Sequence, residues 1–231
     1  MKRVVARGVH QLPVGSHAYL VDGDEGVTLV DTGLPGHVDV VIDTLAHIGR
    51  TPQDVTAVLI THAHSDHTGS AAAVRSATGA PVSMSARDAV VARGEAGTED
   101  PPLLQRLGPL SSVASRMLPE ADPVVVDHEV SEGERTGLPE EWFVVATPGH
   151  TSGHVSYLLD RMGGLLFAGD AAMVDRHGRV GRGWVNAGSA AVDASIHKLA
   201  QLHFRAAYFG HGGFLSNDAA AAFRRYAAGL G

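Results

Sequence analysis

Short apolar runs alternate with glycine- and proline-containing turns and with helical stretches along the whole chain. Two apolar runs flank Gly23-Asp24-Glu25-Gly26 and predict a hairpin with strands at 17–22 and 27–31. Residues 36–48 repeat apolar positions every 3.6 residues, which predicts a helix. Further strands are expected at 57–60, 81–84, 123–127, 141–147, 155–160, 164–168 and 206–209, and further helices at 68–78, 86–93, 193–203 and 217–229. Ser216 or Asn217 is expected to cap the last helix.

Two segments differ from this pattern. Residues 94–122 combine glycine and proline with spaced leucines, which predicts an insertion of two short amphipathic helices. Extra core packing, a lid over a site and a dimer contact remain open as its roles. Residues 171–192 are rich in glycine and are expected to form a loop. No long polar linker interrupts the chain, so residues 1–231 are expected to form one domain.

Composition and charge exclude several classes of protein. The 231 residues are 44% hydrophobic and 19% charged, which is typical of a globular protein. The chain has no cysteine, so thiolate metal ligands and a cysteine nucleophile are excluded. A formal net charge of −7 argues against a nucleic-acid partner. No apolar run approaches 18 residues, so we expect no membrane span and a soluble, cytoplasmic protein with a small-molecule substrate.

The strongest chemical signal is the segment 61–67, THAHSDH, which follows a predicted buried strand directly. His62 and His64 are two apart in extended backbone, so their side chains point the same way and can hold one metal ion. Asp66 and His67 fall where the chain turns into a helix, and they therefore face a different position. One loop can thus serve two adjacent metal ions.

Three later segments repeat this design of a buried strand, a tight turn and a metal-ligating side chain. The ligand-type residues at these three strand ends are His150, Asp170 and His211. Glycine beside each one permits a sharp turn and a close backbone approach. Strand ends at one edge of a sheet are where α/β proteins place their sites. With the first loop, the candidate set has five histidines and two aspartates.

A family resemblance follows from these motifs. They are Asp31-Thr32-Gly33, the H-x-H-x-D-H loop at 62–67, Thr147-Pro148-Gly149-His150, Gly169-Asp170 and Phe209-Gly210-His211-Gly212. Together they resemble the metallo-β-lactamase fold superfamily over essentially the whole chain. The resemblance implies an α/β fold of the αββα sandwich type, with the site along one edge, and a dinuclear centre of the glyoxalase II or lactonase kind.

The resemblance also implies how the ligands divide between two Zn²⁺ ions, with iron or manganese as alternative metals. One ion would be held by His62, His64 and His150, and the other by Asp66, His67 and His211. Asp170 would bridge them. Such a centre carries net positive charge, so it holds hydroxide at neutral pH and stabilises an oxyanion. The expected reaction is hydrolysis by the bridging hydroxide, with Asp66 as the catalytic residue that orients it and accepts its proton.

Other residues have weaker signals. His154 and Asp31 are expected to support the ligands rather than bind metal, and His17 is a candidate for the pocket wall. The glycine-rich loop after Asp170 carries a set of cationic and aromatic side chains: Arg176, Arg179, Arg182 and Trp184. They are interpreted either as an anion-binding pocket wall, which would suit an acidic substrate, or as a solvated surface.

The expected function is hydrolysis of a small ester, thioester or lactone. Only 20 residues follow His211, whereas glyoxalase II carries a C-terminal helical region for glutathione, which argues against a glutathione thioester. A mononuclear iron oxidoreductase similar to persulfide dioxygenases is the main alternative, and a β-lactamase is a weaker one. A tRNA-processing nuclease is disfavoured by the charge of −7. Whether the chain forms a homodimer stays open.

Overall fold

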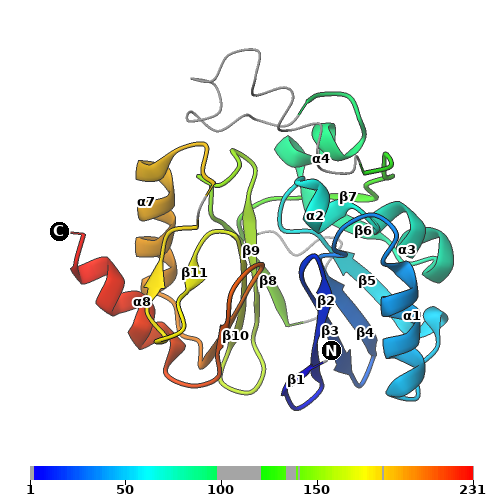
Figure 1. Ribbon diagram of the computed structural model, residues 1–231, viewed down its shortest axis with the longest axis horizontal. Helices are drawn as coiled ribbons and strands as arrows, with labels where there is room; N and C mark the ends of the chain where they lie inside the picture. Colours follow the sequence, from blue (N-terminus) through cyan, green and yellow to red (C-terminus); the bar gives the residue numbers. More distant parts are fainter. Residues whose placement is uncertain (1–2, 98–120, 134–138, 140, 184, 231) are drawn as a thin grey trace.

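Two β-sheets pack face to face with helices on both outer faces (Figure 1). The computed structural model describes residues 3–97, 121–133, 139, 141–183 and 185–230. In the first sheet the strands follow chain order: β1 (Arg3–Ala6), β2 (Val9–Val14), β3 (Ser16–Gly23), β4 (Gly26–Val30), β5 (Val55–Leu59), β6 (Val82–Ser85) and β7 (His128–Val130). The strands β4 to β7 are parallel to one another.

The second sheet has the order β14-β13-β10-β9-β8, and a separate small hairpin joins two short strands. Their bounds are β8 (Trp142–Ala146), β9 (Val155–Leu159), β10 (Leu165–Gly169), β11 (Met173–Val174), β12 (Val180–Gly181), β13 (Ala206–Phe209) and β14 (Phe214–Leu215). Because β9 is antiparallel to both β8 and β10, and β10 is parallel to β13, the strands β8, β10 and β13 all run the same way. Their carboxyl ends therefore lie at one edge of the sheet.

Helices cover each sheet on the side away from the other sheet. Figure 1 shows α1 (Val38–His47) and α3 (Ala71–Thr78) against the first sheet, and α7 (Ser189–Ala200) and α8 (Ala219–Ala228) against the second. Shorter helical elements are η1 (Pro52–Asp54), α2 (Ser65–Thr68) and α4 (Ala86–Ala92). The predicted αββα sandwich is therefore confirmed.

Three layers of apolar side chains fill the sandwich. The middle layer, between the sheets, is rich in aromatic residues that include Tyr19, Trp142, Tyr157, Phe167 and Tyr208. Their rings pack at centroid distances such as 5.0 Å for Phe167 and Tyr208 and 5.3 Å for Trp142 and Phe167. The other two layers lie under the helices of each sheet. This packing makes a rigid base for the loops at the carboxyl edge.

Several predicted boundaries differ from those in the structure. Residues 123–127 form no strand, although Val124 and Val126 are buried; the pairing with β6 begins only at β7. The helix α7 begins at Ser189 instead of 193, and the 171–192 loop contains the β11–β12 hairpin. Neither proposed cap is used at α8, because the N-cap is Asp218, whose side chain makes no capping hydrogen bond.

The first two strands were not predicted from the sequence. Val9, Leu12 and Val14 in β2 are buried, but Pro13 lies between them and argues locally against a strand. The predicted insertion at 94–122 falls largely on 98–120, which lie outside the described residues. Among the residues that the structure describes, no helix is long and apolar enough to cross a bilayer.

Candidate metal centre

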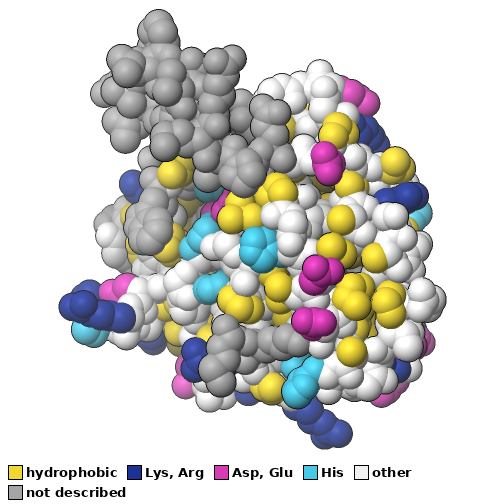
Figure 2. All heavy atoms as spheres, turned by 45° about the vertical axis from the view of Figure 1, so that its right-hand side comes forward, with side chains coloured by type: hydrophobic (Ala, Val, Ile, Leu, Met, Phe, Trp, Pro, Cys, Tyr) yellow, Lys and Arg dark blue, Asp and Glu magenta, His cyan; other side chains and the backbone are white. Residues whose placement is uncertain are grey.

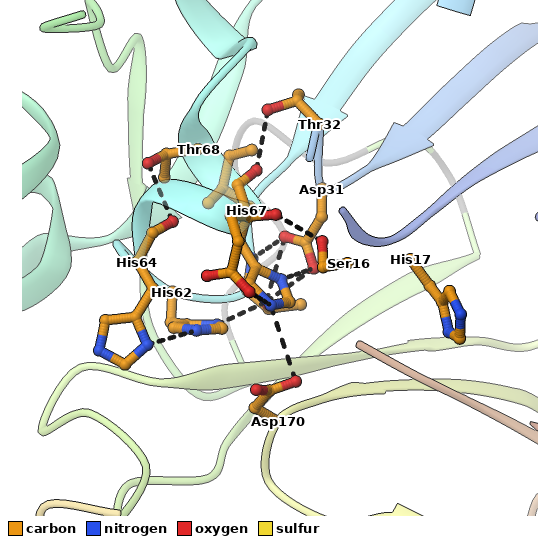
Figure 3. A network of polar contacts seen from close by, with 12 residues as sticks. Ser16, His17, Asp31, Thr32, His62, His64, His67, Thr68 and Asp170 are labelled. Atoms are coloured by element: carbon orange, nitrogen blue, oxygen red, sulfur yellow. Dashed lines mark hydrogen bonds and ion pairs between the residues drawn. The ribbon is translucent and has the colours of Figure 1, made fainter. Parts of the chain in front are cut away.

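All seven predicted ligand residues come together at the carboxyl edge of the two sheets. They form three overlapping groups whose ligand atoms lie within 4.8 Å of one another: His62/His64/His150, His62/His67/Asp170 and Asp66/His67/His211. The segment after β5 supplies four of them, two in the loop and two in α2, and the loops after β8, β10 and β13 supply one each. Figure 3 shows the side chains of the first loop and of Asp170 pointing toward one another.

The three-histidine group joins two loops far apart in the chain. His62 Nε2 lies 3.1 Å from His64 Nδ1, and His150 Nε2 lies 2.9 Å from the same nitrogen. The expected convergence of His62 and His64 is therefore present. Burial, together with the neighbouring imidazoles, lowers the pKa of His62 well below its ordinary value and that of His150 to about 3. The rings of His62 and His150 are thus neutral at pH 7, which is the form that binds a metal.

The second group has the opposite electrostatics, because carboxylates surround its rings. His211 Nε2 lies 3.0 Å from Asp66 Oδ2, and His67 Nε2 lies 3.7 Å from the same oxygen. Burial by itself lowers the pKa of His67, but Asp31, Asp170 and Asp66 outweigh it and raise the pKa to about 10. These carboxylates favour positive charge at this position, and a divalent cation would supply it.

Asp170 lies between the two groups. Its Oδ2 is 3.4 Å from His150 Nε2 and also 3.4 Å from His211 Nε2. Burial raises the pKa of Asp170. One carboxylate oxygen is thus in reach of ring nitrogens that belong to both groups, which is the arrangement a bridging ligand needs.

The residues around the ligands hold them in place, as expected for Asp31 and His154. Asp31 is buried and accepts hydrogen bonds from the Thr61 N–H at 2.8 Å and from His67 Nδ1 at 2.9 Å (Figure 3). His154 Nε2 accepts the Asp170 N–H at 3.0 Å, and its Nδ1 lies 2.9 Å from Thr147 Oγ1. His154 is therefore oriented toward the Asp170 backbone and falls in none of the ligand groups.

Other predicted site residues lie nearby or remain outside the description. His17 lies to one side of the network in Figure 3, and its Nδ1 is 3.3 Å from the Phe209 carbonyl oxygen. Arg179 pairs with Asp175 at 2.9 Å, and Arg182 with Asp193, with Nε to Oδ1 at 2.6 Å. Both arginines thus have carboxylate partners. A further loop member, Arg176, has its Nε 3.0 Å from His177 Nε2, and Trp184 lies outside the described residues.

Asp88 is a buried carboxylate at the site that sequence reasoning missed. It lies in α4, and its Oδ2 accepts the Ala63 N–H at 2.9 Å and the Thr151 hydroxyl at 2.8 Å. The only local signal is the pattern Ser-x-x-Asp from Ser85, which is typical of a helix N-terminus. Its contact with two distant loops is invisible in the sequence.

The residues present fit the binding of divalent metal ions. Within the described part of the chain, His67 Nε2 and Asp170 Oδ1 are buried without a hydrogen-bond partner, although such atoms are normally satisfied. Beside them, Gly210 leaves room that a side chain would fill, because a Cβ there would lie 2.5 Å from His67 Cε1 and closer still to Asp170 Oδ1. Imidazole and carboxylate donors without thiolate suit zinc, iron and manganese.

The face that Figure 2 presents shows histidine side chains gathered near its centre, among hydrophobic and uncharged atoms. His64 and Asp66 are partly exposed, whereas His62 and His67 are fully buried. The candidate centre is therefore open to a small molecule on one side and closed by protein on the other.

Comparisons with known proteins point to one family. The family model of the metallo-beta-lactamase superfamily matches residues 12–211. A probable metallo-hydrolase, YflN of Bacillus subtilis, is 29% identical over 176 residues, or 73% of this chain and 65% of its own length. A hydroxyacylglutathione hydrolase of Cereibacter sphaeroides is 32% identical over 171 residues, or 73% of this chain and 52% of its own. The chain thus spans half to two thirds of these relatives.

A solved structure is also similar. A metallo-beta-lactamase family protein of Thermus thermophilus superposes with a TM-score of 0.69 at 26% identity, covering 98% of this chain and 80% of that one.

Proposed function

Because the chain belongs to the metallo-beta-lactamase superfamily, we propose that it is a metal-dependent hydrolase that holds two Zn²⁺ ions and cleaves a small ester, thioester or lactone. The observation that carries the proposal is the place of Asp170, 3.4 Å from a ring nitrogen of each histidine group. A mononuclear site does not need this shared carboxylate.

In this proposal each group of residues has its own role. His62, His64 and His150 would hold one ion, and Asp66, His67 and His211 the other, with Asp170 shared. When bound, the ions supply a nucleophile from water at neutral pH and a Lewis acid for the substrate carbonyl.

Asp66 is the residue we propose to orient the attacking water and accept its proton. Burial opposes its charged form, but the hydrogen bond with His211 and the charge of His67 lower its pKa below the ordinary value. Its side chain is 25% exposed, so it reaches the open side of the site. A carboxylate that is ionised and accessible can orient an attacking water and take up its proton.

The relatives support the substrate class without fixing the substrate. Hydroxyacylglutathione hydrolases are named for hydrolysis of hydroxyacylglutathione, and several match this chain at about a third identity. Arg179 and Arg182 are already paired with carboxylates, so an anionic substrate would find Arg176 as the cation of this loop without a carboxylate partner among the described residues. We propose a small substrate, with an anionic group as an option that Arg176→Ala tests by comparing charged and neutral esters.

The first experiment is metal analysis of the purified full chain beside Asp170→Ala. We expect about two zinc ions per chain, falling toward one in the variant, since the shared carboxylate is lost. Asp175→Ala, in the exposed β11–β12 turn, is the matched control and should keep the wild-type content. A screen of esters, thioesters and lactones then identifies the substrate class.

Two outcomes contradict the proposal. One is about one iron per chain, unaffected by Asp170→Ala, which indicates oxidoreductase chemistry. The other is an unmutated chain that binds about two zinc ions but hydrolyses no ester, thioester or lactone.

A further inference from the structure

Asp88 connects the two loops that carry the three-histidine group. Its side chain is buried, with the residue 4% exposed. Its Oδ2 accepts the N–H of Ala63, which lies between His62 and His64, and the hydroxyl of Thr151, which follows His150. One oxygen atom is thus the common acceptor for two loops that the chain separates by more than 80 residues.

The backbone around Asp88 is shaped for this contact. A Cβ at Gly153 would lie 2.7 Å from Ser85 Oγ and 2.8 Å from Arg87 Cβ, and closer still to Asp88 Oδ1. Glycine therefore lets the 151–154 turn close directly over the amino end of α4. The Ser85 side chain accepts the Asp88 N–H at 3.3 Å, so the first turn of the helix also holds Asp88.

The second group rests on different residues. Asp31 binds the His67 ring, and the Thr32 hydroxyl donates to the His67 carbonyl oxygen at 2.8 Å. The Ser16 hydroxyl donates to the Asp66 carbonyl oxygen. The two halves of the candidate centre are therefore supported by different elements, by α4 for the histidines and by the start of β3 and the residues after β4 for Asp66 and His67.

We propose that Asp88 is a positioning residue that sets the separation of the two histidine loops and so controls the affinity of the three-histidine position selectively. The inference rests on the proposed function, because it concerns the same metal centre. Truncating Asp88 leaves the buried Ala63 N–H without its acceptor and frees the 151–154 turn, so the rings of His64 and His150 lose their fixed spacing. Losing such a supporting carboxylate lowers metal affinity by roughly 10- to 100-fold.

The test separates the two positions before Asp88 is changed. His211→Ala disables the second group and leaves the three histidines, whereas His64→Ala disables the first group and leaves Asp66, His67 and His211. Metal-free protein of each background is titrated with Zn²⁺ against a competing chelator. We expect Asp88→Ala to weaken Zn²⁺ binding roughly 10- to 100-fold in the His211→Ala background and to change it less than about threefold in the His64→Ala background.

Conservative variants distinguish positioning from general destabilisation. Asp88→Asn keeps an oxygen that can accept both hydrogen bonds, so it should restore part of the affinity that alanine loses. Thr151→Val removes the hydroxyl but keeps the shape, and Thr151→Ser keeps the hydroxyl. Thr151→Val should weaken Zn²⁺ binding at the three-histidine position, and Thr151→Ser should not. Asp127→Ala is the matched control, because Asp127 also accepts a backbone N–H, from Val82 at 2.9 Å, but lies outside the centre.

Several results overturn the inference. If Asp88→Ala lowers Zn²⁺ affinity equally in both backgrounds, Asp88 is a general stabilising residue. If it lowers Zn²⁺ affinity in neither background, Asp88 has no positioning role. If Asp88→Ala does not fold, the valine and serine variants of Thr151 decide, and equal affinity for the two contradicts the proposal. If the unmutated chain binds no Zn²⁺, the proposed function fails as well, whereas tight binding that ignores Asp88 and Thr151 refutes this inference alone.

Discussion

Replacing Gly210 with alanine should disable the centre although no ligand residue is replaced. Gly210 follows β13 and precedes His211, and its φ angle lies outside the left-handed region, so alanine brings no backbone strain. The difficulty is space. The new methyl carbon would lie 2.5 Å from His67 Cε1 and 3.2 Å from His67 Nε2, and closest of all to Asp170 Oδ1.

The size of the effect follows from these distances. Nonbonded carbon atoms need about 3.5 Å, so the buried His67 ring has to retreat by roughly 1 Å, or β13 has to move by a similar amount. Overpacking of this kind costs about 1–3 kcal/mol of stability, with about 2–4 °C in melting temperature for each kcal/mol. A displacement of about 1 Å at a catalytic group costs roughly 100-fold in activity.

The assay combines Zn²⁺ content, hydrolysis rate and melting temperature for Gly210→Ala. Gly181→Ala in β12 is the matched control, because a Cβ there meets no atom within 4 Å. We expect the control to behave like the unmutated chain, and Gly210→Ala to lose metal from the second group together with activity. Wild-type metal content, rate and melting temperature in Gly210→Ala would refute the reasoning.

Three further predictions concern support, charge and metal. His154→Phe should lower stability by about 1–3 kcal/mol, measured by urea unfolding, because it leaves the buried Asp170 N–H without its acceptor; unchanged stability contradicts that role. Hydrogen bonds from Arg75 lower the pKa of Asp127, so its contribution is present above the ordinary aspartate pKa and is lost as the pH falls. Asp127→Asn should therefore cost about 0.5–1 kcal/mol at pH 7 and progressively less as the pH falls through the lowered pKa of Asp127, and a pH-independent difference argues against the ion pair. Removing metal with a chelator should lower the melting temperature, since ions at about 1,000 times their Kd stabilise the fold by about 4 kcal/mol, and added Zn²⁺ should restore it; an unaffected melting temperature shows that the folded chain binds no metal.

The candidate ligands could be predicted from the sequence because each one lies in a short segment that follows a buried apolar strand. Asp170 and His211 are single residues far from the first loop, yet the parallel direction of their strands brings them to the same edge. The β3–β4 hairpin could likewise be predicted, from the turn at Gly23-Asp24-Glu25-Gly26. Local sequence was enough wherever an element and its ligand are adjacent in the chain.

The remaining features depend on contacts that local sequence does not encode. Pro13 argues locally against a strand, but β2 forms because it pairs with β3 and buries its apolar side chains. The sequence left Arg182 open between a pocket wall and a solvated surface, because its partner Asp193 in α7 is recognisable only in the folded chain. Asp88 resembles an ordinary helix-capping residue until the fold brings two histidine loops to it.

The ligand groups draw on both sheets, and this has a consequence for how the loaded protein moves. His62 and His67 follow a strand of the first sheet, whereas His150, Asp170 and His211 follow strands of the second. Ions bound at this edge would cross-link the two sheets, and the sheets could not separate there without breaking coordination bonds. Amide protons beside the aromatic middle layer should then exchange with solvent more slowly in the metal-loaded chain, because opening between the sheets exposes them.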